Sequence, residues 1–122
     1  MVEFALVLPI LCVVLFGVIQ FGVVFKNYVT LTDAARTGAR KAAVSRHSAT
    51  PEADAEAAVR KAAPGLDKPC SGGVGLCVSV SATAWEHGED VTISATYPYN
   101  VSLLGMVVAS GALQSQTTER VE

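Results

Sequence analysis

Residues 4–25 read FALVLPILCVVLFGVIQFGVVF, a run of 22 residues without a charged side chain. As an α-helix this run is about 33 Å long, which matches the hydrocarbon core of a bilayer. A surface helix of a globular protein has a polar face, but here only Gln20 interrupts the apolar circumference. A signal peptide has a basic stretch before a shorter apolar region, and nothing basic precedes Phe4. The run therefore predicts a membrane-spanning helix.

The charges around this run conflict with the cysteines. Only Glu3 precedes the run, and five basic residues follow it: Lys26, Arg36, Arg40, Lys41 and Arg46. The positive-inside rule applied to this chain would leave the rest of it in the cytoplasm. Cys70 and Cys77 flank the flexible stretch SGGVGL, and a disulfide between them implies an oxidising compartment, whereas two separate thiols are the alternative. A basic leader before Met1, removed after it had set the orientation, would reconcile the two observations.

A helical pattern continues beyond the apolar run. Mostly small residues at spacings of three and four form one face: Leu31, Ala34, Ala35, Gly38, Ala39, Ala42 and Ala43. No helix breaker separates this face from the apolar run, so we expect one helix of about 45 residues, nearly 70 Å long. Within it, Pro9 predicts a kink or a locally opened turn. The small residues permit close packing, either on the helix's own domain or among neighbouring helices.

The rest of the chain predicts a small mixed domain. Thr50 can cap a second helix over residues 51–62, with Pro51 in its first turn and the APG at 63–65 ending it. Alternating residues then predict two strands, over 77–83 and from 90 until Pro98 ends the second.

Residues 101–109 form a short apolar piece of undetermined type, and 111–122 alternate as a third, antiparallel strand. We expect Trp85, Tyr97 and Tyr99 to cover one face of this sheet. The predicted class is α+β, with an apolar helix segment over residues 1–26 and a globular domain over 27–122, in which 27–46 continue the long helix.

The first 44 residues resemble the opening segment of TadE-type pilin-like proteins. The block VEFALVLP at residues 2–9 leads a membrane helix in that family, and AARTGAR at 34–40 matches its continuation. TYPY at 96–99 and the final RVE at 120–122 are similar to the family's end, whereas residues 45–96 otherwise carry no resemblance. The family comprises pilins or pseudopilins of the tight-adherence system, related to type IV pilins. The resemblance implies that a prepilin peptidase removes a short basic leader, as the charge pattern also requires.

The resemblance also implies an assembly segment that includes Met1, Glu3, Phe4 and Pro9. A carboxylate in a low-dielectric environment is costly unless it is neutralised or paired. By resemblance, Glu3 would meet the N-terminal amine of a neighbouring subunit; the alternative is a carboxylate that lies among lipid headgroups. The subunits would be held in the bacterial inner membrane and would then assemble, with the pilus machinery, into an extracellular homopolymer. Two rival functions are a minor pseudopilin or assembly factor that stays in the membrane, and a membrane-tethered binding module.

Other chemistry is weakly represented in the sequence. WEHGED at 85–90 is typical of a solvated turn more than of a metal site, and we expect neither a metal, a cofactor nor catalysis. The net charge of −2, with its basic residues spread out, argues against nucleic acid as a partner. Asn100 begins an N-glycosylation pattern that is common by chance. We expect Cys12 to be an apolar packing residue of the helix and His47 to be exposed.

Overall fold

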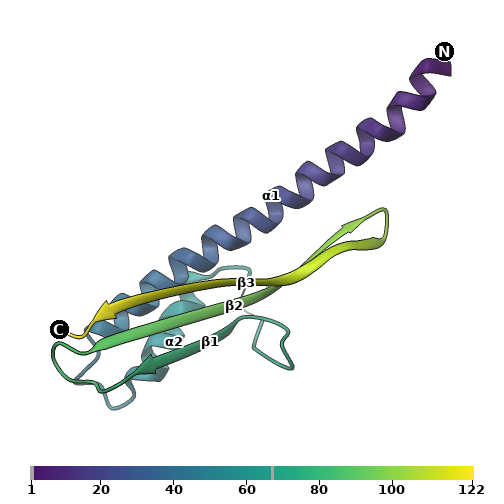
Figure 1. Cartoon of the computed structure of the whole chain (residues 1–122). Coiled ribbons are helices and arrows are strands. Elements are labelled where there is room, and N and C mark those ends of the chain that lie inside the picture. Colours follow the sequence, from purple (N-terminus) through teal and green to yellow (C-terminus); the bar gives the residue numbers. More distant parts are fainter. Residues whose placement is uncertain (1, 67) are drawn as a thin grey trace.

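The computed structural model describes residues 2–66 and 68–122, which form two helices and one sheet. The helices are α1 (Val2–Ala43) and α2 (Pro51–Ala62). The strands are β1 (Cys77–Ala82), β2 (Asp90–Leu103) and β3 (Met106–Arg120). They form an antiparallel sheet in the order β1-β2-β3 (Figure 1). The predicted α+β class is therefore confirmed.

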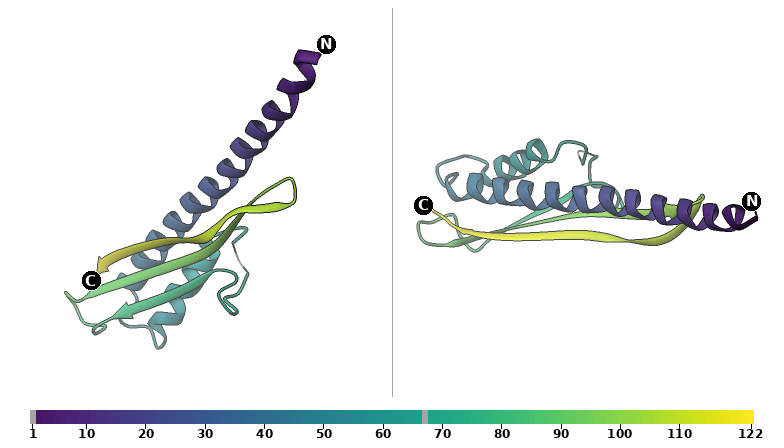
Figure 2. Two further views of the ribbon diagram at one scale, coloured as in Figure 1. Left: turned by 45° about the vertical axis from the view of Figure 1, so that its right-hand side comes forward. Right: turned by 90° about the horizontal axis from the view of Figure 1, so that it is seen from above.

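Helix α1 has two halves in different surroundings. It contains 42 residues, a length of about 63 Å, and runs through Pro9 as one element. Its first half projects away from the rest of the molecule, and its second half lies on the sheet (Figure 1). There α1 contacts β2, β3 and α2, while α2 also contacts β1. Both helices thus cover the same face of the sheet, as the view from above shows (Figure 2).

The face of mostly small residues packs inside the chain's own domain. Of that face, Leu31, Ala34, Ala35, Ala39 and Ala42 are fully buried. They share one core with residues of α2, of the sheet and of the C-terminal end, including Val59, Val91, Ile93 and Val121. At Gly38 an added Cβ would overlap Val59 Cγ2, so a side chain there would push α2 away. Close approach of α1 to α2 therefore accounts for the glycine at position 38.

Helix α2 has the bounds predicted from the sequence. Thr50 occupies the N-cap position, but its side chain makes no capping hydrogen bond. The Ser48 hydroxyl bonds instead to the Asp54 carboxylate, and the Asp54 N–H donates to the Thr50 carbonyl. The acidic residues of the first turn and the basic residues of the last turn complement the helix dipole.

Strand β2 continues through Pro98, so the prediction that this proline ends the strand is wrong. Pro98 pairs in register with Ala112 of β3 and is followed by five more strand residues. The physical reason is that β1 pairs with β2 only as far as Thr96. Beyond Thr96, β2 is an edge strand, where a residue without a backbone N–H is tolerated.

The apolar piece at 101–109 forms the end of a long β2–β3 hairpin. The strands pair up to Leu103 and Met106, with a register shift between Val101 and Ser102. Leu104 and Gly105 connect them, both with positive φ (51° and 84°), as in the tight turns typical of hairpins. This half of the hairpin extends past β1 and runs beside the apolar half of α1 (Figures 1 and 2).

Trp85 and Tyr97 both pack against the core, but they come from different elements. Tyr97 and Tyr99 lie in β2, where residues of the same parity, such as Ile93, face the helices. Trp85 lies in the connection between β1 and β2 and packs against the core from there. The aromatic residues are therefore split between the sheet and a loop.

Candidate membrane and assembly site

The first half of α1 exposes nearly all of its apolar side chains. Fifteen large apolar residues between Phe4 and Phe25 are 44–79% exposed. Transferring these surfaces out of water is worth on the order of 15 kcal/mol, comparable with the whole stability of a small domain. Among the described residues, α1 is a helix long and apolar enough to cross a membrane, and none of its most apolar window is buried. This exposure is unlike that of a soluble core helix and requires lipid or other chains as surroundings.

Glu3 lies in the first turn of α1, at the outer end of the projecting segment. It is exposed, and among the described residues it forms no ion pair. Phe4 and Val7 lie beside it around a shallow hollow, and Phe4 is 79% exposed. The helix terminus itself favours a carboxylate at this position. Any further partner of Glu3 must come from outside the described part of the chain; the expected amine, that of Met1, lies outside the described residues.

Pro9 lies inside this exposed helix segment. Because proline has no backbone N–H, it cannot donate to the Ala5 carbonyl, which leaves one acceptor in the apolar half of the helix. The helix nevertheless continues on both sides. The local opening predicted at Pro9 therefore stays a prediction.

Cys70 and Cys77 are joined in a disulfide, with their Cα atoms 4.8 Å apart. The loop between them is held by backbone hydrogen bonds between Ser71 and Val74. Gly75 has a φ of 92° and lies so close to the Pro69 carbonyl that no side chain would fit there. The bond fastens this loop to the first residue of β1. Cys12 lies outside the bond, exposed on α1.

The remaining candidate residues lie apart from one another. Asn100 is exposed in the outer part of β2. His47 is exposed and accepts a hydrogen bond from Arg46 Nε (2.9 Å). Glu86 and Glu89 belong to the turn before β2, where the Glu89 N–H donates to the Glu86 carbonyl. Within residues 2–66 and 68–122, no three His, Cys, Asp or Glu side chains are grouped to hold a metal ion.

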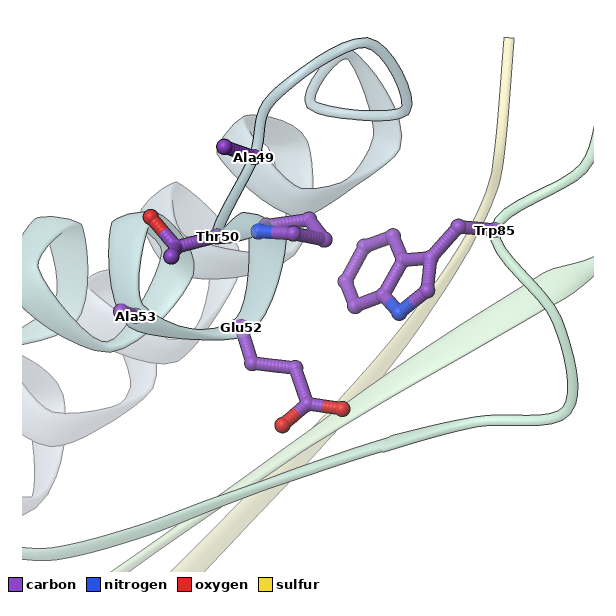
Figure 3. A pocket seen from close by; sticks show the side chains of 6 residues that line it. Ala49, Thr50, Glu52, Ala53 and Trp85 are labelled. Carbon is purple, nitrogen blue, oxygen red and sulfur yellow. The ribbon is translucent and has the colours of Figure 1, made fainter.

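A shallow hollow lies where the β1–β2 connection meets α2. It has a volume of 380 Å³ and is lined by Ala49, Thr50, Pro51, Glu52, Ala53 and Trp85. The Trp85 indole ring points across it toward the start of α2, with Thr50 and Glu52 on the far side (Figure 3). Because Trp85 is half-buried here, the hollow is best explained by packing of the loop on α2.

The groove between α1 and the hairpin was not foreseen from the sequence. It has a volume of 390 Å³ and is lined on the α1 side by Gly17, Phe21 and Val24. The hairpin contributes Tyr99, Val101, Ala109 and Leu113. A signal was present: residues 91–118 contain no charge, and 103–109 are apolar without interruption. Sequence alternation could identify strands there, but not their position beside the membrane segment.

Comparison with known proteins agrees with the resemblance. The family described as TadE-like protein matches residues 1–40. No curated protein and no solved structure matches the chain. The matched segment includes the exposed apolar half of α1 and most of the small residues that pack on the domain. The N-terminal third of this chain is thus similar to TadE-like proteins, in agreement with the resemblance identified from the sequence.

Proposed function

We propose that the chain is a structural pilin subunit that polymerises through α1 into an extracellular filament. The similarity to TadE-like proteins relates it to the Tad pilus. The observation that carries the proposal is the helix segment from Phe4 to Phe25, which projects from a folded domain with its apolar side chains exposed. A soluble protein has no use for such a surface, whereas a filament core buries it.

The same segment would serve two stages in turn. Before assembly, residues 1–26 would hold the subunit in the bacterial inner membrane, with the domain of residues 27–122 on the outer side. During assembly, this segment would leave lipid and pack against the same segment of other subunits. Lipid and the filament core are both apolar, so moving the segment from one to the other costs little hydrophobic free energy. Close packing between helices would then favour the filament. The partners are then identical subunits, a prepilin peptidase and the assembly machinery.

Glu3 would set the position of each subunit along the filament. Its carboxylate stands at the end of the projecting helix, beyond the reach of the described basic side chains. In an apolar core an unpaired carboxylate is strongly disfavoured, so an amine from a neighbouring Met1 would stabilise one register over the others. Phe4 and Pro9 lie in the first turns of the same helix and would form part of this contact between subunits.

The disulfide supports the outer location of the domain. Cys70 and Cys77 are bonded, and disulfides persist in oxidising compartments. The domain would therefore lie outside the cytoplasm in both stages.

One observation favours the rival function, a minor pseudopilin or assembly factor that stays in the membrane. The β2–β3 hairpin faces Gly17, Phe21 and Val24 across a groove and so stands beside one side of α1, where Phe21 is still 70% exposed. A subunit in a filament core would need that side for helix packing, whereas a subunit that stays in lipid would not. The two functions are distinguished by where the assembled chain is found.

The test is cryo-electron microscopy of material sheared from the cell surface, with the N-terminus of the purified chain sequenced alongside. A helical filament made of this chain, with Glu3 near a neighbour's amine, supports the pilin. A sheared fraction without the chain, which remains in the membranes, favours the pseudopilin.

A matched pair of variants tests the carboxylate. We expect Glu3→Ala to insert into the membrane normally but to lower the filament yield. Glu52→Ala is the control, because Glu52 is also an exposed acid in the first turn of a helix. Normal filaments from Glu3→Ala would refute the role assigned to this residue.

A further inference from the structure

We propose that the end of the β2–β3 hairpin, residues 101–109, inserts into the outer leaflet of the membrane beside α1. The inference rests on the membrane stage of the proposed function. It concerns a surface that neither the helix segment nor the family similarity accounts for, since residues 101–109 lie outside the matched segment. The occupant of this surface is lipid.

The first argument is depth. Gly17, which lines the groove against the hairpin, lies eight residues before Phe25, or about 12 Å of helix rise. If residues 4–25 span a hydrocarbon core of roughly 30 Å, Gly17 lies well below its outer boundary. Val101 and Ala109 line the same groove, and the turn at Leu104 lies still farther out along the hairpin. The hairpin end therefore lies near the depth of the middle of the span.

The second argument is the change in side-chain pattern along the hairpin. Over the domain, β2 alternates buried Val91 and Ile93 with the half-exposed polar residues Thr92 and Ser94. At the far end this alternation stops and both faces become apolar. The exposed large residues there are Leu104 (77%), Met106 (70%), Val107 (64%) and Val108 (62%). An end that is apolar on both faces matches surroundings of lipid better than water.

The third argument is charge. No charged residue occurs between Asp90 and Glu119, so the hairpin can enter an apolar phase without moving an ion into it. The two charged residues that close the hairpin, Asp90 and Arg120, lie at its opposite end, where they approach within 3.5 Å. Neutral and charged parts of the hairpin are thus separated along its length.

Backbone hydrogen bonding limits how deep the end can go. The strands pair with each other up to Leu103 and Met106, but β1 stops at Thr96, so both outer edges of the far half carry unpaired groups. Such edges are costly in the hydrocarbon interior, whereas headgroups and water can satisfy them near the surface. Insertion of the turn beyond the depth of Gly17 therefore requires headgroups and water to reach these edges beside α1.

Tryptophan fluorescence in vesicles tests the insertion. The chain has one tryptophan, Trp85, in the β1–β2 connection at the opposite end of β2 from the turn, so Trp85→Phe provides a background without tryptophan. Leu104→Trp then reports on the hairpin, Phe16→Trp on α1, and Ser81→Trp, at an exposed site of β1, on the domain. The full chain is reconstituted in phosphatidylcholine–phosphatidylglycerol vesicles containing lipids brominated near either end of the acyl chain.

We expect the Leu104→Trp probe to be quenched by the brominated lipids, and most strongly by the deeper bromines. The Phe16→Trp probe should be quenched most by the deeper bromines, and the Ser81→Trp probe by neither. Adding Val107→Asp to the Leu104→Trp protein should reduce the inserted population about tenfold, because a carboxylate is strongly disfavoured in lipid. Quenching of the Phe16→Trp probe should be unaffected by Val107→Asp.

The other outcomes are distinct. Quenching at Phe16→Trp without quenching at Leu104→Trp would overturn the inserted hairpin and leave the membrane helix standing. Absence of quenching at both sites would overturn the membrane stage itself. A blue-shifted Leu104→Trp emission that lipids do not quench, and that shifts to the red as protein is diluted in lipid, would assign the surface to a second copy of the chain and overturn the lipid occupant.

Discussion

Replacing Gly38 by alanine should destabilise the domain, although alanine is the better helix former. In the middle of a helix the change from glycine to alanine normally stabilises by up to about 1 kcal/mol. Here the added Cβ would overlap Val59 Cγ2 and approach the Ala55 carbonyl at 3.4 Å. Val59 is fully buried and branched at Cβ, so it has no alternative rotamer in a helix that relieves the overlap cheaply.

The magnitude follows from these opposing terms. Overpacking of this kind costs about 1–3 kcal/mol. After the helix-propensity gain, a net destabilisation of about 1 kcal/mol remains from the middle of this range, which corresponds to a fall in Tm of roughly 5 °C for a domain of this size. The assay is thermal unfolding of the full chain in a mild detergent, followed by near-ultraviolet circular dichroism.

Two further variants show whether the overlap is the cause. Gly22→Ala is the matched control, because an added Cβ there has no atom within 4 Å; its Tm should be unchanged or higher. Val59→Ala alone should lower the free energy of unfolding by about 2 kcal/mol. The loss in the double variant should be smaller than the sum of the two single losses by about 1 kcal/mol or more, because the new methyl group fills part of the vacated space. A Gly38→Ala protein as stable as the parent would refute the packing argument.

The remaining predictions concern the loop and the surface. Replacing Cys70 and Cys77 together by serine should lower the free energy of unfolding by about 2.5 kcal/mol, because the unfolded chain is no longer restricted by the short closed loop. Adding a reductant to the parent protein should lower its Tm by the same amount as the double substitution does. An unchanged Tm in both experiments would contradict a stabilising bond. Glu56→Gln removes the negative charge that pairs with Arg60 (2.7 Å). The pair is only half-buried and its members are four residues apart on α2, so we expect a loss of only about 0.3–0.5 kcal/mol in thermal unfolding. A loss several times larger would mean that the pair supports more than α2.

The hairpin beside α1 also bears on assembly. In the free subunit it lies along Gly17, Phe21 and Val24. Helix packing in a filament would either use the other faces of α1 or displace the hairpin. The fluorescence probe at Leu104 would report on the second case, because displacement would change its surroundings when filaments form.

Much of the fold follows from local patterns in the sequence. An uncharged run of 22 residues excludes a polar face whatever its surroundings, so the exposed half of α1 was predictable. Proline at a first helical position and APG after the last one gave the bounds of α2 correctly. The cysteine spacing left two alternatives open, and the structure contains the disulfide.

What the tertiary structure decided is which surfaces meet. Spacing identified the face that contains Gly38, but only the arrangement of α2 shows that its neighbour is Val59 of the same chain. Whether Pro98 ends a strand depended on where β1 stops, which lies outside the local sequence. The position of the hairpin beside α1 likewise arises from contacts between residues some eighty positions apart. Periodicity along a chain determines which side chains share a face, whereas the partner of that face is determined by packing of the whole chain, and that is a property of three-dimensional shape.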